Sequence, residues 1–319
     1  MQPIRSTRLL LQETAIPCRS RLVLRMDRKA APDNFEYPTA LPAETHSMQR
    51  HFIEIDGARM SYIDQGQGFP VLLGHSYLWS AEMWQPQIEA LSAHFRVIVP
   101  ELWGHGGSDA PPATTIDMNS LVRQHLTLLD KLEIAKCHLV GLSVGGMWGA
   151  PLAATHPERI DRLVLMDTYL GAEPEETRLK YFALLDAASE TGEFSDLLLD
   201  IIVPIFFHAG GQTVPEIRER FRAQLKASSA QTIRESLDPM GRIIFGRHDL
   251  LEQLEQLPSE RTILMCGDQD IPRPPEESNE MARIVGCLAA QIPFAGHISS
   301  LENPRVVNEF LLNWLPRNR

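Results

Sequence analysis

The feature that most constrains the fold of this chain is a series of short, almost continuous apolar segments separated by helix-like ones. The apolar segments are residues 70–74, 95–100, 137–142, 160–166 and 261–266. Strands that are apolar on both faces are typical of a parallel sheet with helices packed on both sides. The sequence therefore predicts an α/β fold built on a mostly parallel sheet.

The segments between and around these strands complete the pattern. Residues 50–56 and 60–64 flank an Asp56–Gly57 pair, which is a strong signal for a β-hairpin. A further short strand is expected at 289–293. Helical periodicity predicts helices at 80–94, 116–132, 144–156, 276–284 and 304–315.

Three regions are predicted from this order. Residues 48–168 and 261–319 form the α/β core, and residues 169–260, where the strand signals stop, form a helical cap. Such an insertion would cover the carboxyl ends of the strands, where open α/β sheets bind ligands. Residues 1–47 are predicted to be a disordered extension, because residues 1–29 hold seven basic residues against two acidic ones.

The sharpest chemical motif is G-L-S-V-G-G at residues 141–146, between a predicted strand and a predicted helix. A serine at such a sharp turn needs small neighbours, here Gly141 and Gly145, for the turn to close. Its hydroxyl then projects above the sheet at a helix N-terminus, where unpaired N–H groups favour a developing oxyanion. Ser143 is therefore the predicted nucleophile.

A serine hydroxyl needs a base, and His297 follows the last predicted strand at the same edge of the sheet. The acid is expected between the two, in the order serine, acid, histidine. The segment C-G-D-Q-D offers Asp268 and Asp270, of which Asp270 is favoured because it stands further beyond the turn at Gly267. Asp268 and the more distant Asp167 remain alternatives.

An oxyanion hole requires two fixed donors. The backbone N–H groups of Val144, directly after the serine, and of Tyr77, in the loop after strand 70–74, are the predicted donors. Leu78 and Trp79 are candidate residues of an apolar substrate pocket. The remaining histidines of these loops, His75 and His105, are predicted to brace the backbone.

Together these motifs resemble the α/β-hydrolase superfamily from about residue 50 to the C-terminus: H-S-Y, G-H-G-G-S-D, G-L-S-V-G-G, G-D-Q-D and G-H-I-S-S-L-E-N-P. The resemblance implies an eight-stranded sheet with an antiparallel second strand, flanking helices and a helical cap insertion. Within the superfamily the chain is most similar to 3-oxoadipate enol-lactonases and cofactor-free haloperoxidase-like esterases. Two residues depart from the usual pattern: Ser76 replaces a glycine beside the oxyanion loop, and Glu101 replaces an aspartate.

These observations predict a serine hydrolase that cleaves a carboxylic ester or lactone through an acyl-enzyme, without a cofactor or metal. One alternative is a carbon–carbon bond hydrolase, for which Arg222 or Arg242 would supply a basic residue in the cap. The other alternative is a non-catalytic ligand-binding protein of the same fold.

Composition narrows the partners further. A net charge of −11 argues against a general nucleic-acid binder, and no apolar stretch reaches the roughly 18 residues of a membrane span. The four cysteines form no C-x-x-C pair, so the sequence predicts neither a zinc site nor a redox motif. A cytoplasmic enzyme acting on a small molecule is expected, and a homodimer is left open.

Overall fold

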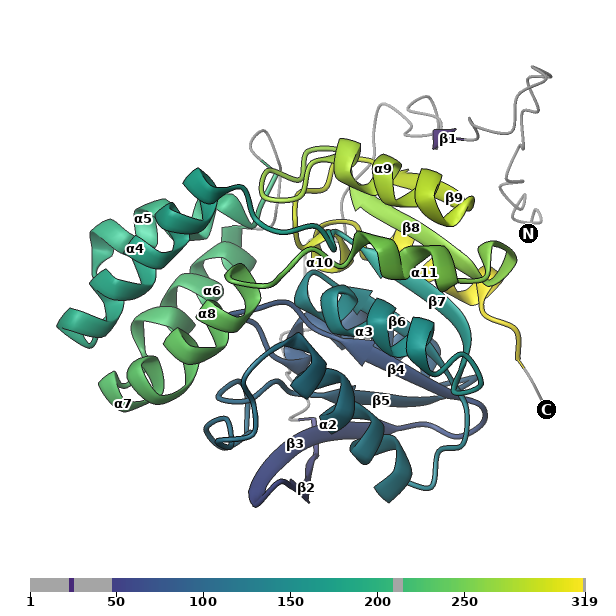
Figure 1. Ribbon diagram of the computed structural model, residues 1–319, viewed down its shortest axis with the longest axis horizontal. Helices are drawn as coiled ribbons and strands as arrows, with labels where there is room; N and C mark the ends of the chain where they lie inside the picture. Colours follow the sequence, from purple (N-terminus) through teal and green to yellow (C-terminus); the bar gives the residue numbers. More distant parts are fainter. Residues whose placement is uncertain (1–22, 26–47, 209–214, 318–319) are drawn as a thin grey trace, which may run out of the picture.

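A computed structural model describes residues 23–25, 48–208 and 215–317 of the chain. A twisted sheet runs through the molecule, and helices pack against it (Figure 1). The strand order is β1-β9-β8-β7-β6-β4-β5-β3-β2. The strands are β1 (Val23–Arg25), β2 (Arg50–Ile55), β3 (Ala58–Gln65), β4 (Pro70–Gly74), β5 (Arg96–Pro100), β6 (Cys137–Leu142), β7 (Ile160–Met166), β8 (Thr262–Gly267) and β9 (Leu288–Ile292).

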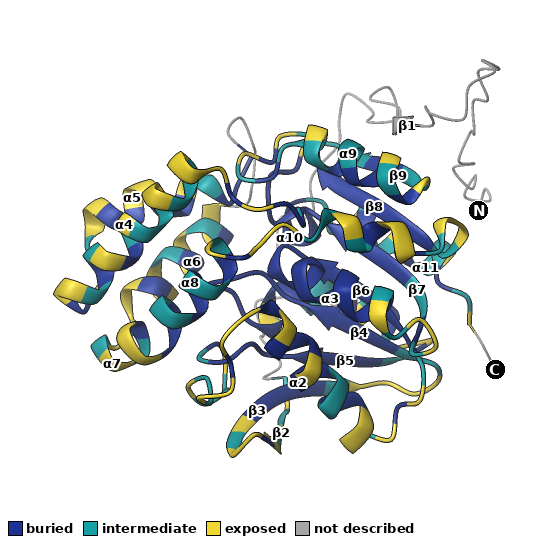
Figure 2. Ribbon diagram, viewed as in Figure 1, coloured by how far each residue is buried: buried dark blue, intermediate teal, exposed yellow. Residues whose placement is uncertain are grey.

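The predicted eight-stranded, mostly parallel sheet is confirmed in β2–β9. β3, the second of these eight strands, runs antiparallel to its neighbours β2 and β5. All other neighbouring pairs among the eight strands are parallel. β6 and β8 are buried along their whole length, which explains why their sequences are almost continuously apolar. Figure 2 shows the central strands as the most buried part of the molecule.

β1 adds a ninth strand at the edge of the sheet, parallel to β9. It is the only described part of residues 1–47 and was not among the predicted strands. The prediction of a disordered extension otherwise concerns residues outside those that the structure describes.

The helices of the core are η2 (Ala81–Trp84), α1 (Gln85–Leu91), α2 (Met118–Lys131), α3 (Val144–Thr155), α9 (Pro275–Val285), α10 (Ser299–Glu302) and α11 (Pro304–Trp314). α2 begins where the Asp117 carboxylate accepts a hydrogen bond from the Ser120 amide, and it buries one apolar face. The helix expected at 80–94 is divided into η2 and α1. Pro86 stands in the first turn of α1, where its missing N–H is tolerated.

Between β7 and β8 the chain forms helices, as predicted for this region. They are α4 (Glu175–Thr191), α5 (Asp196–Ile205), α6 (Pro215–Lys226), α7 (Ala230–Thr232), the π-helical turn η3 (Ile233–Leu237) and α8 (Asp238–Phe245), which we call the helical insertion. The short turns η4 (Leu251–Gln256) and η5 (Ser259–Arg261) lead back to β8. The helices of the helical insertion lie together to one side of the sheet (Figure 1). The outer faces of α4 and α5 are exposed (Figure 2).

The helical insertion contacts the core at the loop after β4. The Tyr77 hydroxyl donates to the Leu237 carbonyl at 2.6 Å, and the Gln224 amide donates to the Leu78 carbonyl at 3.2 Å. Trp79 stacks on Phe221 with ring centroids 4.2 Å apart. These contacts place helix α6 and the turn η3 beside the loop that carries the predicted oxyanion donor.

Cys137 and Cys266 are buried in β6 and β8 as small apolar residues. Among the helices that the structure describes, none is long and apolar enough to cross a lipid bilayer.

Candidate active site

Ser143 lies at a sharp turn between β6 and α3. Its backbone angles, φ 56° and ψ −119°, are unusual for a residue with a side chain. The glycines around it allow close backbone approach: a Cβ at Gly141 would lie 2.4 Å from the Gly145 carbonyl oxygen, and one at Gly145 would lie 2.2 Å from the Gly74 carbonyl oxygen. The second contact also brings the end of β4 against the turn.

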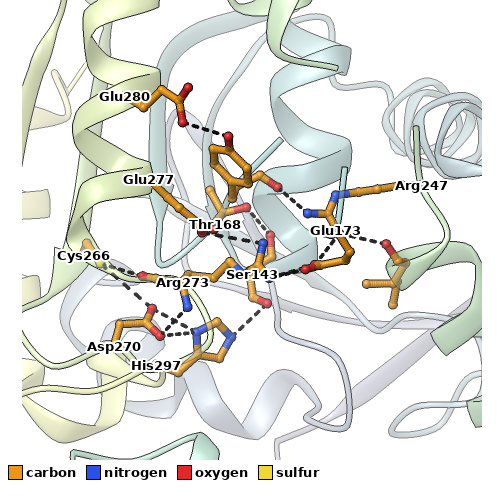
Figure 3. A network of polar contacts seen from close by, with 12 residues as sticks. Ser143, Thr168, Glu173, Arg247, Cys266, Asp270, Arg273, Glu277, Glu280 and His297 are labelled. Atoms are coloured by element: carbon orange, nitrogen blue, oxygen red, sulfur yellow. Dashed lines mark hydrogen bonds and ion pairs between the residues drawn. The ribbon is translucent and has the colours of Figure 1, made fainter. Parts of the chain in front are cut away.

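The structure brings the predicted nucleophile, base and acid into contact (Figure 3). His297 Nε2 lies 3.0 Å from Ser143 Oγ, and His297 Nδ1 lies 3.1 and 3.0 Å from the two Asp270 carboxylate oxygens. All three residues are buried. In the tautomer that satisfies both contacts, the Nδ1–H group donates to Asp270 and Nε2 accepts from the serine hydroxyl.

The two alternative acids have other partners. Asp268 Oδ1 accepts from the Ala295 amide at 3.4 Å, a contact that braces the loop backbone. Asp167 accepts from the Gly267 amide at 2.7 Å and contacts the Ser299 hydroxyl. Asp270 is thus the acid that lies against His297, and its Oδ1 also accepts from the Arg273 amide at 3.0 Å.

The two predicted oxyanion donors belong to adjoining backbone segments. Val144 is the first residue of α3, and Tyr77 lies in the loop after β4. Among the described residues, neither amide donates to a protein acceptor. The phenol of Tyr77 points elsewhere, to the Leu237 carbonyl, and burial raises its pKa. Of the two donors that Tyr77 carries, only its backbone N–H group therefore remains for the predicted oxyanion hole, together with that of Val144.

The loop that carries Tyr77 is held by two buried histidines. His75 Nε2 accepts from the Leu102 amide at 2.8 Å, and His105 Nε2 accepts from the Leu78 amide at 3.0 Å. Burial lowers the pKa of both rings, that of His105 to about 3, which keeps them neutral and able to accept. The hydrogen bonds match the bracing predicted for both histidines, and Leu78 itself adopts a left-handed φ of 67°.

The two departures from the family pattern have different surroundings. The Glu101 carboxylate is a buried acceptor for Arg50 Nε, the Ser61 hydroxyl and the Gly107 amide, at 2.9, 2.6 and 2.8 Å. The longer acid therefore joins the hairpin to the glycine-rich loop. Ser76 donates its amide to the Met83 sulfur at 3.3 Å, while its buried hydroxyl has no partner among the described residues.

Of the two candidate pocket residues, Trp79 lines a cavity of about 220 Å³ and Leu78 does not. The cavity lies between the loop after β4, η2, α6 and α10, and its apolar lining includes Met83, Ile217, Phe221 and Leu301. The Trp79 indole N–H is buried without a hydrogen-bond partner among the described residues. Phe206 lies near both this cavity wall and the base, with its ring centroid 6.3 Å from that of Trp79 and 5.6 Å from that of His297.

A buried ionic cluster adjoins the acid and was not predicted from the sequence. Glu173 pairs with Arg247 at 2.8 Å and with Arg273 at 2.7 Å, and all three side chains are almost fully buried (Figure 3). Glu277 lies 3.6 Å from Arg273, and burial raises its pKa to about 7. These residues come from separate segments without a shared motif, so the sequence carried no signal for them.

Arg222 and Arg242 were the basic cap residues that the carbon–carbon bond hydrolase alternative would use. Both make ion pairs on the outside of the helical insertion. Arg222 pairs with Asp196 and Asp200, and Arg242 pairs with Asp186 and Asp238. Near the predicted acid, the backbone amide of Arg273 donates to Asp270, and the side chains of Arg273 and Arg247 both pair with Glu173.

Three buried groups have the spacing of metal ligands: Asp167, Cys266 and Asp270 lie within 4.8 Å of one another. Their oxygens already accept from the Gly267 and Arg273 amides and contact Ser299 and His297. Hydrogen bonds within the protein therefore explain why these three groups lie close together.

The chain is similar in sequence and in fold to proteins of known structure and name. A family model described as alpha/beta hydrolase fold matches residues 70–304. A putative carbamate hydrolase RutD from Pantoea ananatis is 27% identical over 252 residues, covering 77% of this chain and 88% of that protein. An esterase from Thermogutta terrifontis (27% identity, 83% of this chain, 97% of that one) and an enol-lactonase from Burkholderia xenovorans (25%, 83% and 99%) both superpose with a TM-score of 0.72.

Proposed function

The chain belongs to the alpha/beta hydrolase fold family and is a hydrolase of that fold, and we propose that it cleaves a carboxylic ester or lactone through an acyl-enzyme formed on Ser143. The observation that carries this proposal is the continuous contact from Ser143 through His297 to Asp270. Structural similarity to an esterase and an enol-lactonase supports the same reaction class.

In the proposed reaction, His297 Nε2 takes the hydroxyl proton of Ser143 as the oxygen attacks the substrate carbonyl. Asp270 accepts the Nδ1–H group, holds the required tautomer and stabilises the imidazolium that forms. The imidazolium then protonates the leaving alcohol, and His297 activates water to hydrolyse the acyl-enzyme. Each step uses groups of the protein itself, so the proposal includes no cofactor or metal.

We assign the stabilisation of the negative charge on the tetrahedral intermediate to the backbone N–H groups of Val144 and Tyr77. Val144 lies at the N-terminus of α3, where the helix dipole favours negative charge. Tyr77 is held in place through its neighbour Leu78, whose amide donates to His105. Fixed donors of this kind stabilise the transition state because they need no reorganisation as the charge develops.

We assign the substrate pocket to the cavity beside Trp79, with residues 169–260 acting as its cap. Trp79 and Phe221 supply apolar surface, and the unpartnered indole N–H of Trp79 offers one donor to a polar atom. Phe206, whose ring lies near both Trp79 and His297, links this cavity to the proposed base. Leu78 has no direct part in this pocket.

Two rival reactions use the same nucleophile. Carbamate hydrolysis is suggested by the name of the relative from Pantoea ananatis, and carbon–carbon bond hydrolysis was the alternative expected from the sequence. Ester, lactone, carbamate and vinylogous diketone substrates, each in a graded series of chain length, would separate them by kcat/KM. We expect the esters or lactones to be cleaved fastest.

The nucleophile is tested by labelling the full chain with a fluorophosphonate and locating the adduct by peptide mass spectrometry. Wild type and the exposed-serine control Ser259→Ala should be labelled at Ser143 and should hydrolyse p-nitrophenyl acetate. Ser143→Ala should do neither while unfolding at the wild-type temperature. Hydrolysis by Ser143→Ala at the wild-type rate would remove Ser143 from the mechanism, and an unlabelled wild type would favour the ligand-binding alternative.

A further inference from the structure

The carboxyl end of β7 contacts all three loops that carry the proposed triad. The Ser143 amide donates to the Met166 carbonyl at 2.9 Å, and the Thr168 hydroxyl donates to the Ser143 carbonyl at 2.7 Å. The two residues on either side of Asp167 therefore hold the backbone of the nucleophile at both its N–H and its C=O group.

Asp167 itself reaches the other two loops. Its Oδ1 accepts from the amide of Gly267, at the start of the loop that carries Asp270, and its Oδ2 contacts the hydroxyl of Ser299, the first residue of α10 and two residues after His297. Its own amide donates to the Met265 carbonyl at 2.9 Å. One side chain thus joins the acid loop to the histidine loop.

The backbone at Asp167 is unusual for this role. Its φ of 46° lies in the left-handed region, where a residue with a side chain is disfavoured. Asp167 is completely buried, and Thr168 is almost so. Backbone strain of this kind persists where the surrounding structure holds it, and it clusters at functional sites.

The surroundings of the Asp167 carboxyl group favour its uncharged form. Burial, followed by the neighbouring charge of Asp270, raises its pKa well above the usual value, and Glu302 acts in the same direction. A neutral acid beside Asp270 supplies hydrogen bonds without adding a second negative charge to the site. Its function is therefore one that an amide of the same shape can also perform.

We propose that Asp167 and Thr168 are positioning residues of the active site: Asp167 joins the acid and histidine loops through its two carboxyl oxygens, and Thr168 holds the nucleophile turn. The proposal rests on the proposed function above. Neither residue touches the reacting atoms, and both act by setting the distances between Ser143, His297 and Asp270. A misplacement of about 1 Å in such a site is expected to lower the rate on the order of 100-fold.

The first test compares Asp167→Asn with Asp167→Ala in the full chain. The amide oxygen of asparagine can accept from Gly267, and its N–H₂ group can donate to the Ser299 oxygen, so we expect kcat within about threefold of wild type and an unchanged pH profile. Asp167→Ala should lower kcat about 100-fold with little change in KM. Loss of activity in Asp167→Asn equal to that in Asp167→Ala would overturn the neutral role.

The second test uses Thr168, which remains informative if Asp167→Ala fails to fold. Thr168→Val keeps the shape of the side chain but removes the donor to the Ser143 carbonyl, and it should lower kcat about tenfold. Thr168→Ser restores a hydroxyl and should recover most of that loss. Equal activity of the valine and serine variants, or a lower unfolding temperature with unchanged kcat, would reduce both residues to a purely structural role.

Fluorophosphonate labelling separates failure of this inference from failure of the proposed function. If wild type is labelled at Ser143 and active while these variants retain wild-type kcat, the positioning role alone is wrong. If wild type is neither labelled nor active on any substrate of the series, the proposed function fails and the positioning role fails with it.

Discussion

The loops of the active site and the helical insertion beside them are held by different kinds of contact. Around Ser143 the contacts are between backbone groups at distances that only glycine allows, as at Gly141 and Gly145. The helical insertion meets the core through side chains, chiefly the stack of Trp79 on Phe221 and the hydrogen bond from Tyr77 to Leu237. Backbone contacts of the first kind tolerate few substitutions, whereas side-chain packing of the second kind tolerates many.

The difference suggests how one fold can keep a reaction and change its substrate. The proposed chemistry depends on the ends of β6, β7 and β8 and on the loop after β9, and the proposed pocket wall depends on α6. The buried cluster of Glu173, Arg247 and Arg273 lies at the junction of the two regions, since Arg247 follows α8 and Arg273 follows the proposed acid. Substitutions in the proposed catalytic loops should therefore change kcat, those in the proposed pocket wall should change KM, and those at the junction should change the free energy of unfolding.

The largest effect is expected at the acid. Asp270→Asn should lower kcat by roughly 10³ to 10⁴-fold, because the amide no longer holds the required histidine tautomer and cannot stabilise the imidazolium. Asp268→Asn should cost less than about tenfold, because an amide oxygen still accepts from Ala295. Steady-state kinetics on the best ester decides between them, and equal losses would reopen the choice of acid.

The next largest effect is expected at the junction. Glu173→Gln would leave two buried arginines without their shared carboxylate and should lower the free energy of unfolding by about 3–5 kcal/mol. The matched control is Glu176→Gln, which removes an exposed pair with Lys180 and should leave the free energy of unfolding nearly unchanged. Urea unfolding measures both. Similar small values would show that the junction contributes little to stability.

A smaller effect on the free energy of unfolding is expected when the pH is lowered, and it arises from buried histidines of the α/β core. Burial lowers the pKa of His105 to about 3 and of His125 to about 4, so the folded protein does not bind protons that the unfolded chain binds below about pH 6.5. The free energy of unfolding should therefore fall as the pH drops from 7 to 5, by about 2 kcal/mol for each histidine. Glu277, with a pKa raised to about 7, acts in the opposite direction, because its neutral form is favoured in the folded state.

A variant isolates one histidine from these opposing contributions. His125 stacks on Trp148 at 3.7 Å, and His125→Phe keeps the ring while removing the titrating group. Its unfolding free energy should fall by about 2 kcal/mol less than that of wild type between pH 7 and pH 5. Parallel pH curves for the two proteins would contradict the assignment.

The smallest effect is expected at the proposed pocket wall. Trp79→Ala should raise KM about tenfold for the preferred ester and shift the preferred chain length, with little change in kcat, because it removes uniform binding surface. Phe52→Ala, at an exposed aromatic residue of β2, is the control and should change neither constant. A Trp79→Ala enzyme with wild-type KM and an altered kcat would place Trp79 with the catalytic loops instead.

Much of the core was predictable because its signals are local. The bounds of β4 and β6 follow directly from apolar runs that end in turn residues, and the Ser143 turn follows from two glycines at fixed spacing. Even the departure at residues 80–94 has a local cause, because Pro86 starts a new helix. β1 and α10 were missed since elements of three and four residues carry almost no periodicity.

The sequence by itself determined the sheet, the turn at Ser143 and the placing of His297 after the last strand, because short-range packing and backbone geometry dictate them. Only the tertiary structure decided that Asp270 rather than Asp268 contacts His297, that Asp167 joins two loops, and that Trp79 but not Leu78 lines a cavity. These facts depend on where side chains from distant segments meet. Such meetings are set by the packing of whole elements, on which no local pattern in the chain reports.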